Sequence, residues 1–398
     1  MNNRLTGLAF YLGVVQFFLL ASWTVYAIFL PGLLDSVGIE KRWVAWVLLA
    51  DQALFACFDI AAGFAADRAF RLYARMGFVL AAVGALSCAA FLILPWLPGA
   101  GVGPALFLGV TVLWVVSSAA LRAPLFGLLA RHAAKPAVPR LAGLAMAGMG
   151  VAAALSPYMG TLLTGLDPRL PFALSSLSLL LVVLGLVVAE RRGIPDTTAA
   201  PEAPTPALSA WAFLPALWLA AGAMQIAVFL QAAPRYLRDV GQDALPWLLP
   251  IFWVGFSLVA FFAGSFGARW GAARVFALGC LMGGFGIWLT GLTGFEAAIS
   301  GYALAGLGWA AALKSVFGLA AESGRPERVG SYTGLVFAVL AGAAFMRIGI
   351  NLTGWPGLPE RAPLLTLVSL GGWVLAGLTI WLLDRRLRGR LSAQGGVI

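Results

Sequence analysis

Apolar residues in this sequence are gathered into blocks of about 20 residues, and short charged segments separate the blocks. A helix of that length crosses the roughly 30 Å of hydrocarbon in a bilayer. Because the backbone has no water to bond inside a bilayer, each block is predicted to be a helix. The sequence therefore predicts an all-α membrane protein with twelve transmembrane helices, at residues 5–30, 43–66, 76–97, 104–130, 141–165, 172–189, 211–233, 247–267, 275–294, 297–321, 332–353 and 364–383.

The composition agrees with a lipid environment. Of 398 residues, 61% are hydrophobic and 11% are charged, whereas a soluble domain is about half apolar and about a quarter charged. The net charge of +10 is unevenly placed: the N-terminus, the segments after even-numbered helices and the C-terminal tail hold 17 Lys and Arg residues, and the opposite segments hold six. Basic residues are retained on the cytoplasmic side. Both termini are therefore predicted to be cytoplasmic, and no nucleic-acid partner is indicated.

No residue pattern indicates an enzyme, a metal site or a cofactor. The sequence lacks a Gly-x-Ser-x-Gly turn, a His-Glu-x-x-His motif and a phosphate-binding Gly-x-x-x-x-Gly-Lys-Ser/Thr loop. Its single histidine, His132, falls in a predicted loop, and its three cysteines fall within predicted helices, where they are expected to pack as small residues. The first apolar block is too long for a cleaved signal peptide, so it is expected to remain as the first helix.

The chain repeats its own pattern. Pro31-x-x-Leu34-x-x-Val37-Gly38 recurs 203 residues later as Pro234-x-x-Leu237-x-x-Val240-Gly241. Phe-Gly-Leu ends both the fourth and the tenth block, at 126–128 and 317–319, and an acid followed by two arginines closes each half, at 190–192 and 384–386. We therefore expect two parallel six-helix bundles related by an axis along the membrane normal. Their expected boundaries are 1–192 and 210–398, joined by a Pro-, Ala- and Thr-rich linker at 193–209.

The segment after the second predicted helix reads Gly63-Phe-Ala-Ala-Asp-Arg-Ala-Phe-Arg71. Together with the helix count, the repeat and the central linker, it resembles the major facilitator superfamily of secondary transporters, whose pattern there is Gly-x-x-x-Asp-Arg-x-Gly-Arg-Arg. Phe70 and Leu72 depart from that pattern. The second half carries a weaker copy in which Ala268 replaces the acid. The residues that carry this conformational motif are Gly63, Asp67, Arg68, Arg71, Gly264 and Arg269.

The resemblance implies a carrier whose two halves rock around a midplane site. Opposite charges at Asp67 and Arg68 would lock one half against the other; the alternative is a turn whose arginines only set topology. In the fifth helix, Gly143 and Ser156-Pro157-x-x-Gly160 are similar to the family's antiporter motif, which slightly favours export. Ordinary packing of small residues is the other explanation of that pattern.

Five ionisable residues fall within predicted spans. A charge at mid-bilayer costs at least about 2.5 kcal/mol, so such residues normally face a partner or a wet cavity. Asp59 and Arg122 have similar depths by residue count, at about 1.5 Å per residue, and are predicted to pair within the first half. Asp51 and Arg347 are predicted near the midplane.

Helices 2 and 11 face each other in the resembled family, so an Asp51–Arg347 pair is expected to span the cleft between halves. Protonation of Asp51 would weaken that pair and couple transport to protons. A permanent salt bridge is the alternative. Asn351 lies one turn from Arg347 and would extend the site. Lys314 adds a second cation to that half and favours an anionic substrate; otherwise it extends to the membrane surface.

Helices 1, 4, 7 and 10 line the central cavity in the resembled family. Polar and aromatic residues on these predicted helices suit an amphipathic organic ligand, although each of them is also explained by packing. The predicted substrate-binding residues are Gln16, Trp23, Tyr26, Trp114, Ser118, Gln225, Gln231, Trp309, Lys314, Arg347 and Asn351, and the predicted proton-coupling or gating residues are Asp51, Asp59, Arg122 and Arg347.

The sequence thus predicts a secondary active transporter of a small amphipathic or anionic organic solute, coupled to protons, with export slightly favoured. An uptake symporter for an organic anion, and a sensor or assembly subunit with a carrier-like fold, are the alternatives. The Ala- and Gly-rich composition and short loops favour a bacterial inner membrane, and we expect a monomer without a cofactor.

Overall fold

The computed structural model describes residues 3–72, 76–193, 208–262, 270–323 and 328–395. Within these ranges every regular element is a helix, and twelve helical spans are long and apolar enough to cross a membrane. The predicted fold class is therefore confirmed. Of the linker predicted at 193–209, residues 194–207 lie outside the described ranges.

The first half contains six spans built from seven helices, because the fourth span is interrupted. These helices are α1 (Asn3–Ser36), α2 (Val44–Leu72), α3 (Gly77–Ile93), α4 (Pro104–Ala119), α5 (Ala123–His132), α6 (Val138–Leu163) and α7 (Arg169–Gly193).

The second half contains the other six spans. Its seventh span joins α8 to α9 through a π-helical segment, and its eighth joins the short α10 to α11. The elements are α8 (Ala210–Gln225), the π-helix Ile226–Gln231, α9 (Ala232–Tyr236), α10 (Leu245–Leu248), α11 (Pro250–Phe262), α13 (Ala272–Thr290), α14 (Phe295–Ser323), α15 (Val329–Leu352) and α16 (Ala362–Gly395).

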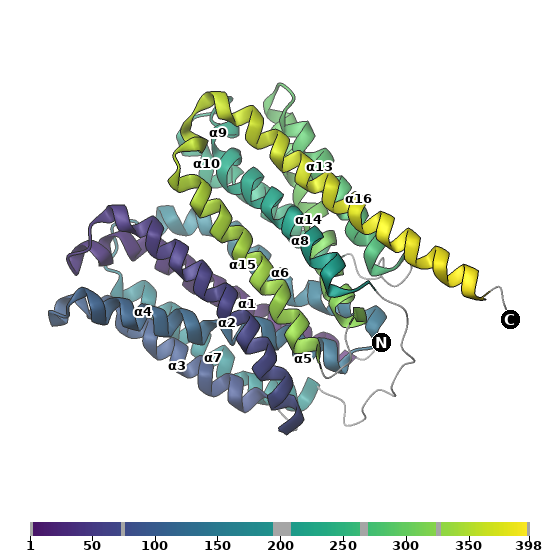
Figure 1. Ribbon diagram of the computed structural model, residues 1–398. Helices are drawn as coiled ribbons and strands as arrows, with labels where there is room; N and C mark the ends of the chain where they lie inside the picture. Colours follow the sequence, from purple (N-terminus) through teal and green to yellow (C-terminus); the bar gives the residue numbers. More distant parts are fainter. Residues whose placement is uncertain (1–2, 73–75, 194–207, 263–269, 324–327, 396–398) are drawn as a thin grey trace.

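The helices form two bundles. Figure 1 shows α3, α4 and α7 together on one side and α13 and α16 on the other. Between them α2 of the first half packs along α15 of the second, and α6 packs along α11. These two helix pairs form the main contact between the bundles, and the candidate site lies beside the first of them.

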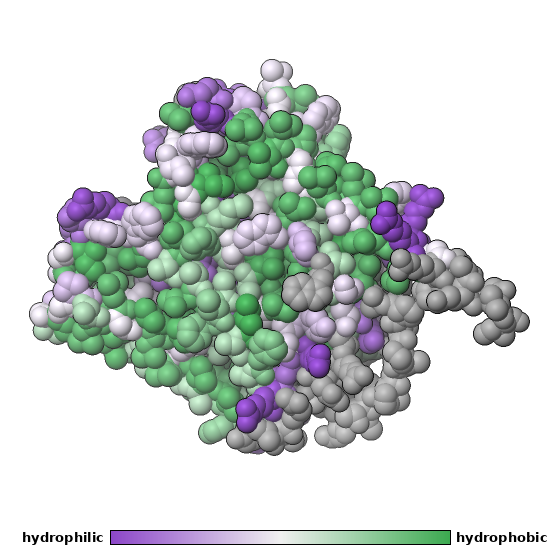
Figure 2. Space-filling model, viewed as in Figure 1, coloured by the Kyte–Doolittle hydropathy of each residue, from purple (hydrophilic) through white to green (hydrophobic). Residues whose placement is uncertain are grey.

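The outer surface of the bundles is apolar. Large side chains such as Phe78, Leu181 and Phe262 are more than 70% exposed, and Figure 2 shows apolar residues over the middle of the visible face with strongly polar residues gathered at its ends. Exposed apolar area of this extent is unfavourable in water. It suits hydrocarbon, and the protein is an integral membrane protein.

Small residues allow the helices to approach closely inside each bundle. A Cβ atom added to Gly279 of α13 would lie 2.7 Å from backbone atoms of Gly308 and Ala312 on α14. Lipid provides no hydrophobic drive for helix association, so close packing of small residues takes over that role. Glycines at such contacts therefore stabilise the packing of the helices against one another.

Each half ends with an acidic residue, Glu190 or Asp384, that contacts the start of the third transmembrane span of that half. Glu190 accepts backbone hydrogen bonds from Met76 (2.8 Å) and Gly77 (2.6 Å), at the N-terminus of α3. In the second half, Oδ2 of Asp384 lies 3.5 Å from Nε of Arg274, near the start of α13. A carboxylate is stabilised by the unpaired N–H groups of a helix N-terminus. In both halves the acid contacts the start of the third span, through backbone N–H groups for Glu190 and through the side chain of Arg274 for Asp384.

Besides the break between α10 and α11, the fourth and seventh spans are interrupted. In the fourth, α4 ends at Ala119 and α5 begins at Ala123 with Pro124 in its first turn. Proline has no N–H, so the preceding turn loses a helical hydrogen bond. In the seventh, the π-helix precedes Pro234. Interruptions of this kind free backbone groups and redirect side chains, and they often mark functional positions.

Candidate functional site

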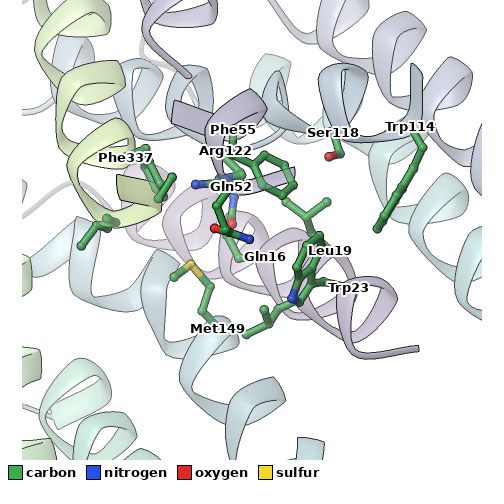
Figure 3. Close-up of a pocket in the computed structure, with 13 residues that line it drawn as sticks. Gln16, Leu19, Trp23, Gln52, Phe55, Trp114, Ser118, Arg122, Met149 and Phe337 are labelled. Atoms are coloured by element: carbon green, nitrogen blue, oxygen red, sulfur yellow. The ribbon is translucent and has the colours of Figure 1, made fainter. Parts of the chain in front are cut away.

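A cavity of ≈ 210 Å³ lies where α1, α2, the α4–α5 interruption and α6 of the first half meet α15. Figure 3 shows the side chains that line it, with polar groups between aromatic rings. Trp23 stacks on Trp114 with ring centroids 6.0 Å apart and meets the edge of Phe55 at 5.4 Å. The lining residues are Gln16, Leu19, Leu20, Trp23, Gln52, Phe55, Trp114, Ser118, Arg122, Met149, Phe337, Leu340 and Ala341.

Arg122 is held at the α4–α5 interruption, where its backbone (φ −106°, ψ −88°) is not helical. The side-chain amide of Gln16 donates a 2.8 Å hydrogen bond to the carbonyl of the preceding residue, Leu121. That bond satisfies a buried acceptor which the broken helix has freed. The interruption thereby directs the guanidinium of Arg122 into the cavity wall.

Arg122 and Asp59 form an ion pair, with Nη2 2.8 Å from Oδ2. Asp59 is fully buried, and neither of its oxygens has a hydrogen-bond partner among the described residues. The guanidinium lies over the rings of Phe55 (4.4 Å) and Phe337 (5.4 Å), the latter from the second half. The predicted pair is thus present, without a directed hydrogen bond.

Asp51 lies two turns from Asp59 on α2 and has a different partner. The hydroxyl of Tyr26 donates a 2.9 Å hydrogen bond to it, and both side chains are buried. The predicted Asp51–Arg347 pair is not among the ion pairs of the described residues, and this expectation is wrong for the conformation seen here. The reason is that an aromatic cluster around Tyr26 and Trp114 holds Asp51 inside the first half.

Arg347 lies on α15 with its guanidinium 4.8 Å from the ring of Phe229 in the π-helix. Its Nε is buried and has no hydrogen-bond partner within the described ranges, and the same holds for Oε1 of Gln225. Asn351, one turn further along α15, is exposed. A stacked guanidinium with an unused donor is suited to an anion.

None of the predicted binding residues of the second half, Arg347 and Asn351 included, is among the residues that line the cavity. Gln231 donates to the carbonyl of Ala362 and to Thr366, and Trp309 packs against Trp373 with centroids 5.8 Å apart. Lys314 is buried. Its Cδ would lie 3.6 Å from a Cβ atom added to Gly143 of α6. Of the predicted substrate-binding residues, Gln16, Trp23, Trp114 and Ser118 line the cavity, and so does Arg122 of the predicted gating residues.

The two halves are joined tightly at one end of α2 and α15, which we call the closed end. Asp67 accepts hydrogen bonds from the backbone N–H groups of Gly330 and Ser331, each 2.8 Å long, and from the Ser331 hydroxyl. A Cβ on Gly63 would lie 2.4 Å from the carbonyl oxygen of Gly330. Motif residues Gly264 and Arg269 and the side chain of Arg71 lie outside the described residues, and Arg68 is exposed.

Three phenylalanines complete the closed end. Phe126 of α5 stacks on Phe317 of α14 at 4.7 Å, and both contact Phe337 of α15. Sequence reasoning did not propose these residues as a site. The signal was present, because Phe126 and Phe317 occupy matching places in the repeated Phe-Gly-Leu pattern. Gln52, Phe55 and Met149 of the cavity wall carried no such signal.

Among the described residues, no group of three or more His, Cys, Asp or Glu side chains could hold a metal ion. The residues at the site offer charge pairing, stacking and hydrogen bonding. Such a site can bind and release a small molecule and exchange a proton, and its wall includes residues from both halves.

Comparisons with known proteins agree with this arrangement. A sequence model described as Major Facilitator Superfamily matches residues 12–347, and no curated protein matches. Among solved structures, the human organic anion transporter MFSD10 (TETRAN) is similar with a TM-score of 0.70 at 15% identity, over 95% of this chain and 99% of that one. A bacterial homologue of the iron transporter ferroportin, in an outward-facing state, has a TM-score of 0.67 at 15% identity, over 94% and 98%. At such identities the likeness concerns the fold.

Proposed function

This chain belongs to the Major Facilitator Superfamily and is a membrane transporter rather than an enzyme, and we propose that it carries a small amphipathic organic anion in a proton-coupled cycle. The observation that carries the proposal is the position of Arg122, a cation in the wall of an aromatic cavity at the junction of the two halves. An aromatic wall with a few directed polar groups suits a ligand that has an apolar body and one charged group.

The contacts between halves support the proposal of alternating access. The contacts at the closed end join residues of α2 and α5 to residues of α14 and α15. In the proposed cycle these contacts separate, the cavity becomes accessible from that side, and equivalent contacts form elsewhere. The buried acids of α2, Asp51 and Asp59, are the candidate proton carriers.

Export is the first proposed direction. It is supported by α6, whose small residues let it pack between α1 and α11: a Cβ on Gly148 would lie 1.7 Å from the carbonyl oxygen of Gly13, and one on Gly150 would lie 2.5 Å from Ser257. Helices packed this closely can slide or rock as units. Ser156 belongs to the antiporter-like pattern of α6, and its hydroxyl oxygen lies 3.2 Å from the hydroxyl oxygen of Thr24 on α1.

Uptake of an organic anion together with a proton is the second proposed direction. It is supported by the Asp59–Arg122 pair, because an acid and a cation in contact can take up a proton and an anion together. In either case we propose that the closed end and both termini face the cytoplasm, since that side holds most of the basic residues. We further propose a bacterial inner membrane and a monomer.

Flux into proteoliposomes tests the proposed function. Purified protein is reconstituted and offered a panel of radiolabelled aromatic carboxylates and sulfonates with and without an imposed pH gradient. Accumulation that depends on the gradient is the expected result, and its sign gives the direction. Absence of flux for every solute, with intact folded protein, would instead indicate a sensor or assembly subunit.

A further inference from the structure

We infer that a groove between α1 and α7 of the first bundle binds one anionic glycerophospholipid, with its phosphate between Arg4 and Arg192 and an acyl chain along the groove. The groove has a volume of ≈ 460 Å³, and both arginines are exposed. It shares no lining residue with the central cavity. The inference therefore does not depend on the solute that the protein carries.

The start of α1 lies beside the end of α7, because the two helices pack together and run antiparallel. The hydroxyl of Tyr11 donates a 2.6 Å hydrogen bond to the carbonyl of Val182, and further along α1 the hydroxyl oxygens of Ser22 and Ser175 lie 2.7 Å apart. Higher residue numbers on α1 thus match lower numbers on α7. The first turn of α1 is therefore level with the last turn of α7.

Each helix contributes one face to the groove. Apart from Asn3, the lining positions are 4, 7, 8 and 11 on α1 and 185, 188, 189 and 192 on α7. Both sets have the i, i+3, i+4, i+7 spacing of a single helical face. One end of the groove is therefore basic, at Arg4 and Arg192, and the rest consists of glycines, aliphatic side chains and Tyr11.

The basic end of the groove lies at the depth of lipid headgroups. Arg169 and Arg192 stand near the two ends of α7, about 35 Å apart at 1.5 Å per residue. That distance slightly exceeds the roughly 30 Å of the hydrocarbon core. Gly185 lies two turns inside Arg192, about 10 Å along the helix axis. The groove thus changes from charged to apolar where a membrane lipid changes from headgroup to chain.

The charge at this end suits an anionic headgroup. None of the described residues that line the groove is an acid, and the acid nearest in sequence, Glu190, accepts hydrogen bonds from Met76 and Gly77 of the third span. Arginine binds phosphate through paired N–H donors, and basic pockets between transmembrane helices bind anionic headgroups. A zwitterionic headgroup would bring its own cation to the two guanidinium groups and is therefore disfavoured.

Two glycines keep the groove open. A Cβ added to Gly185 would lie 2.2 Å from the hydroxyl oxygen of Tyr11, so glycine is what lets that side chain pack against α7. Gly7 is exposed, and a Cβ added there would meet no described residue within 4 Å. A larger side chain at Gly7 would therefore fill the groove without displacing the surrounding protein.

A second groove, beside the other ends of α1 and α7, provides a comparison. Its volume is similar, ≈ 470 Å³, but it is lined by both Asp167 and Arg169, and Arg169 lies over the ring of Trp96 at 4.5 Å. Gly32 of α1 lines this groove and is exposed, and a Cβ added to it would also meet nothing described within 4 Å. The same two helices thus supply a matched groove in which an acid accompanies the arginine.

Competition between two lipids tests the inference. Delipidated protein in detergent receives equal amounts of phosphatidylglycerol and phosphatidylcholine with identical chains, and native mass spectrometry measures which lipid is retained. The first bound lipid is expected to be phosphatidylglycerol with a preference of about tenfold or more. The melting temperature of the protein should also rise with phosphatidylglycerol, because a ligand of the folded state stabilises it.

Five substitutions separate charge from shape. Arg4→Gln and Arg192→Gln should each lower the preference about fivefold, whereas Arg169→Gln should leave it unchanged. Gly7→Leu should abolish retention of the first phosphatidylglycerol, because the new side chain fills the groove while both arginines of the site remain. Gly32→Leu makes the same change on the same helix and should bind as the wild type does. Size-exclusion profiles and melting curves in phosphatidylcholine establish that each variant is folded.

Three results would overturn the inference: a wild type without preference between the two lipids, retention of phosphatidylglycerol by Gly7→Leu, or an effect of Arg169→Gln as large as that of Arg192→Gln. Glycerol 3-phosphate provides the last arm of the test. It should not displace the lipid at equal concentration. Displacement would also overturn the inference, since the headgroup alone would then suffice and the apolar part of the groove would have no role.

Discussion

The carboxylate of Asp67 at the end of α2 accepts a 2.8 Å hydrogen bond from the backbone N–H of Ser331, 264 residues further along the chain and in the other half of the molecule. Ser331 lies in the first turn of α15, where backbone N–H groups have no partner within the helix. A negative charge is favoured there by the helix dipole. The motif acid therefore acts across the interface between halves.

Asp67→Asn is expected to loosen the closed end. The amide cannot supply the negative charge, and the loss of about 1 kcal/mol shifts a two-state population about fivefold. Spin labels at Ala134 and Arg328, exposed positions of the two halves near this end, should report a larger population of long distances in the variant. An unchanged distance distribution would mean that the carboxylate does not hold the halves together. Asp35→Asn, an exposed acid near the far end of α1, is the control.

Gly334→Ala is expected to prevent closure and to reduce transport by an order of magnitude or more. Its Cβ would lie 2.4 Å from the carbonyl oxygen of Asp59, too close for any real contact, so α15 must move away from α2. Gly349→Ala on the same helix is the matched control, because nothing lies within 4 Å of its Cβ. Initial rates of flux in proteoliposomes distinguish the two. Equal rates would show that α15 does not need this close approach.

Gln16→Met is expected to destabilise the protein. It leaves the carbonyl of Leu121 buried without its side-chain donor, and an unsatisfied buried acceptor costs about 1–3 kcal/mol. Gln52→Met is the control in the same cavity wall, since Gln52 has no hydrogen bond within the described ranges that the change would remove. Melting temperatures in detergent should fall for Gln16→Met and change little for Gln52→Met. The reverse order would contradict the role given to Gln16.

Arg347→Lys is expected to weaken binding of aromatic anions even though the charge is kept. The guanidinium stacks on Phe229, and an ammonium group cannot reproduce that planar contact or its directed donors. We expect about a tenfold loss of affinity, on the order of 1.4 kcal/mol. Arg361→Lys is the matched control. Arg361 also lies over an aromatic ring, that of Trp355, but it does so at an exposed turn. Calorimetry with naphthalene-2-sulfonate makes the comparison, and equal effects would show that the Arg347 guanidinium is not needed for anion binding.

The local pattern of the sequence predicted much of the fold and part of the site. Twelve apolar blocks became twelve spans, because each block has to satisfy its backbone within itself. Depth counted along two helices placed Asp59 and Arg122 at one level, and they form an ion pair. The same counting placed Asp51 and Arg347 together, whereas in this structure Asp51 bonds Tyr26 and Arg347 lies over Phe229, since depth does not say which way a side chain points.

The aromatic residues show the limit of this reasoning most clearly. Trp23 and Trp114 line the cavity, whereas Trp309, of the same type and on a helix of the predicted cavity set, packs within its own half. In a uniformly apolar helix the hydrophobic pattern does not distinguish lipid-facing, core and cavity-facing positions. Phe337 is part of the cavity wall only because α15 packs against α2.

The sequence by itself determined that the chain crosses a membrane, how many times it does so, and that it does so as two related halves. Each of these follows from local composition and from repetition along the chain. Tertiary structure alone decided that Asp51 meets Tyr26 and not Arg347, and that α2 and α15 are joined at the Asp67 end. Those outcomes depend on helix rotation and on contacts between residues hundreds of positions apart, and no local pattern encodes either of them.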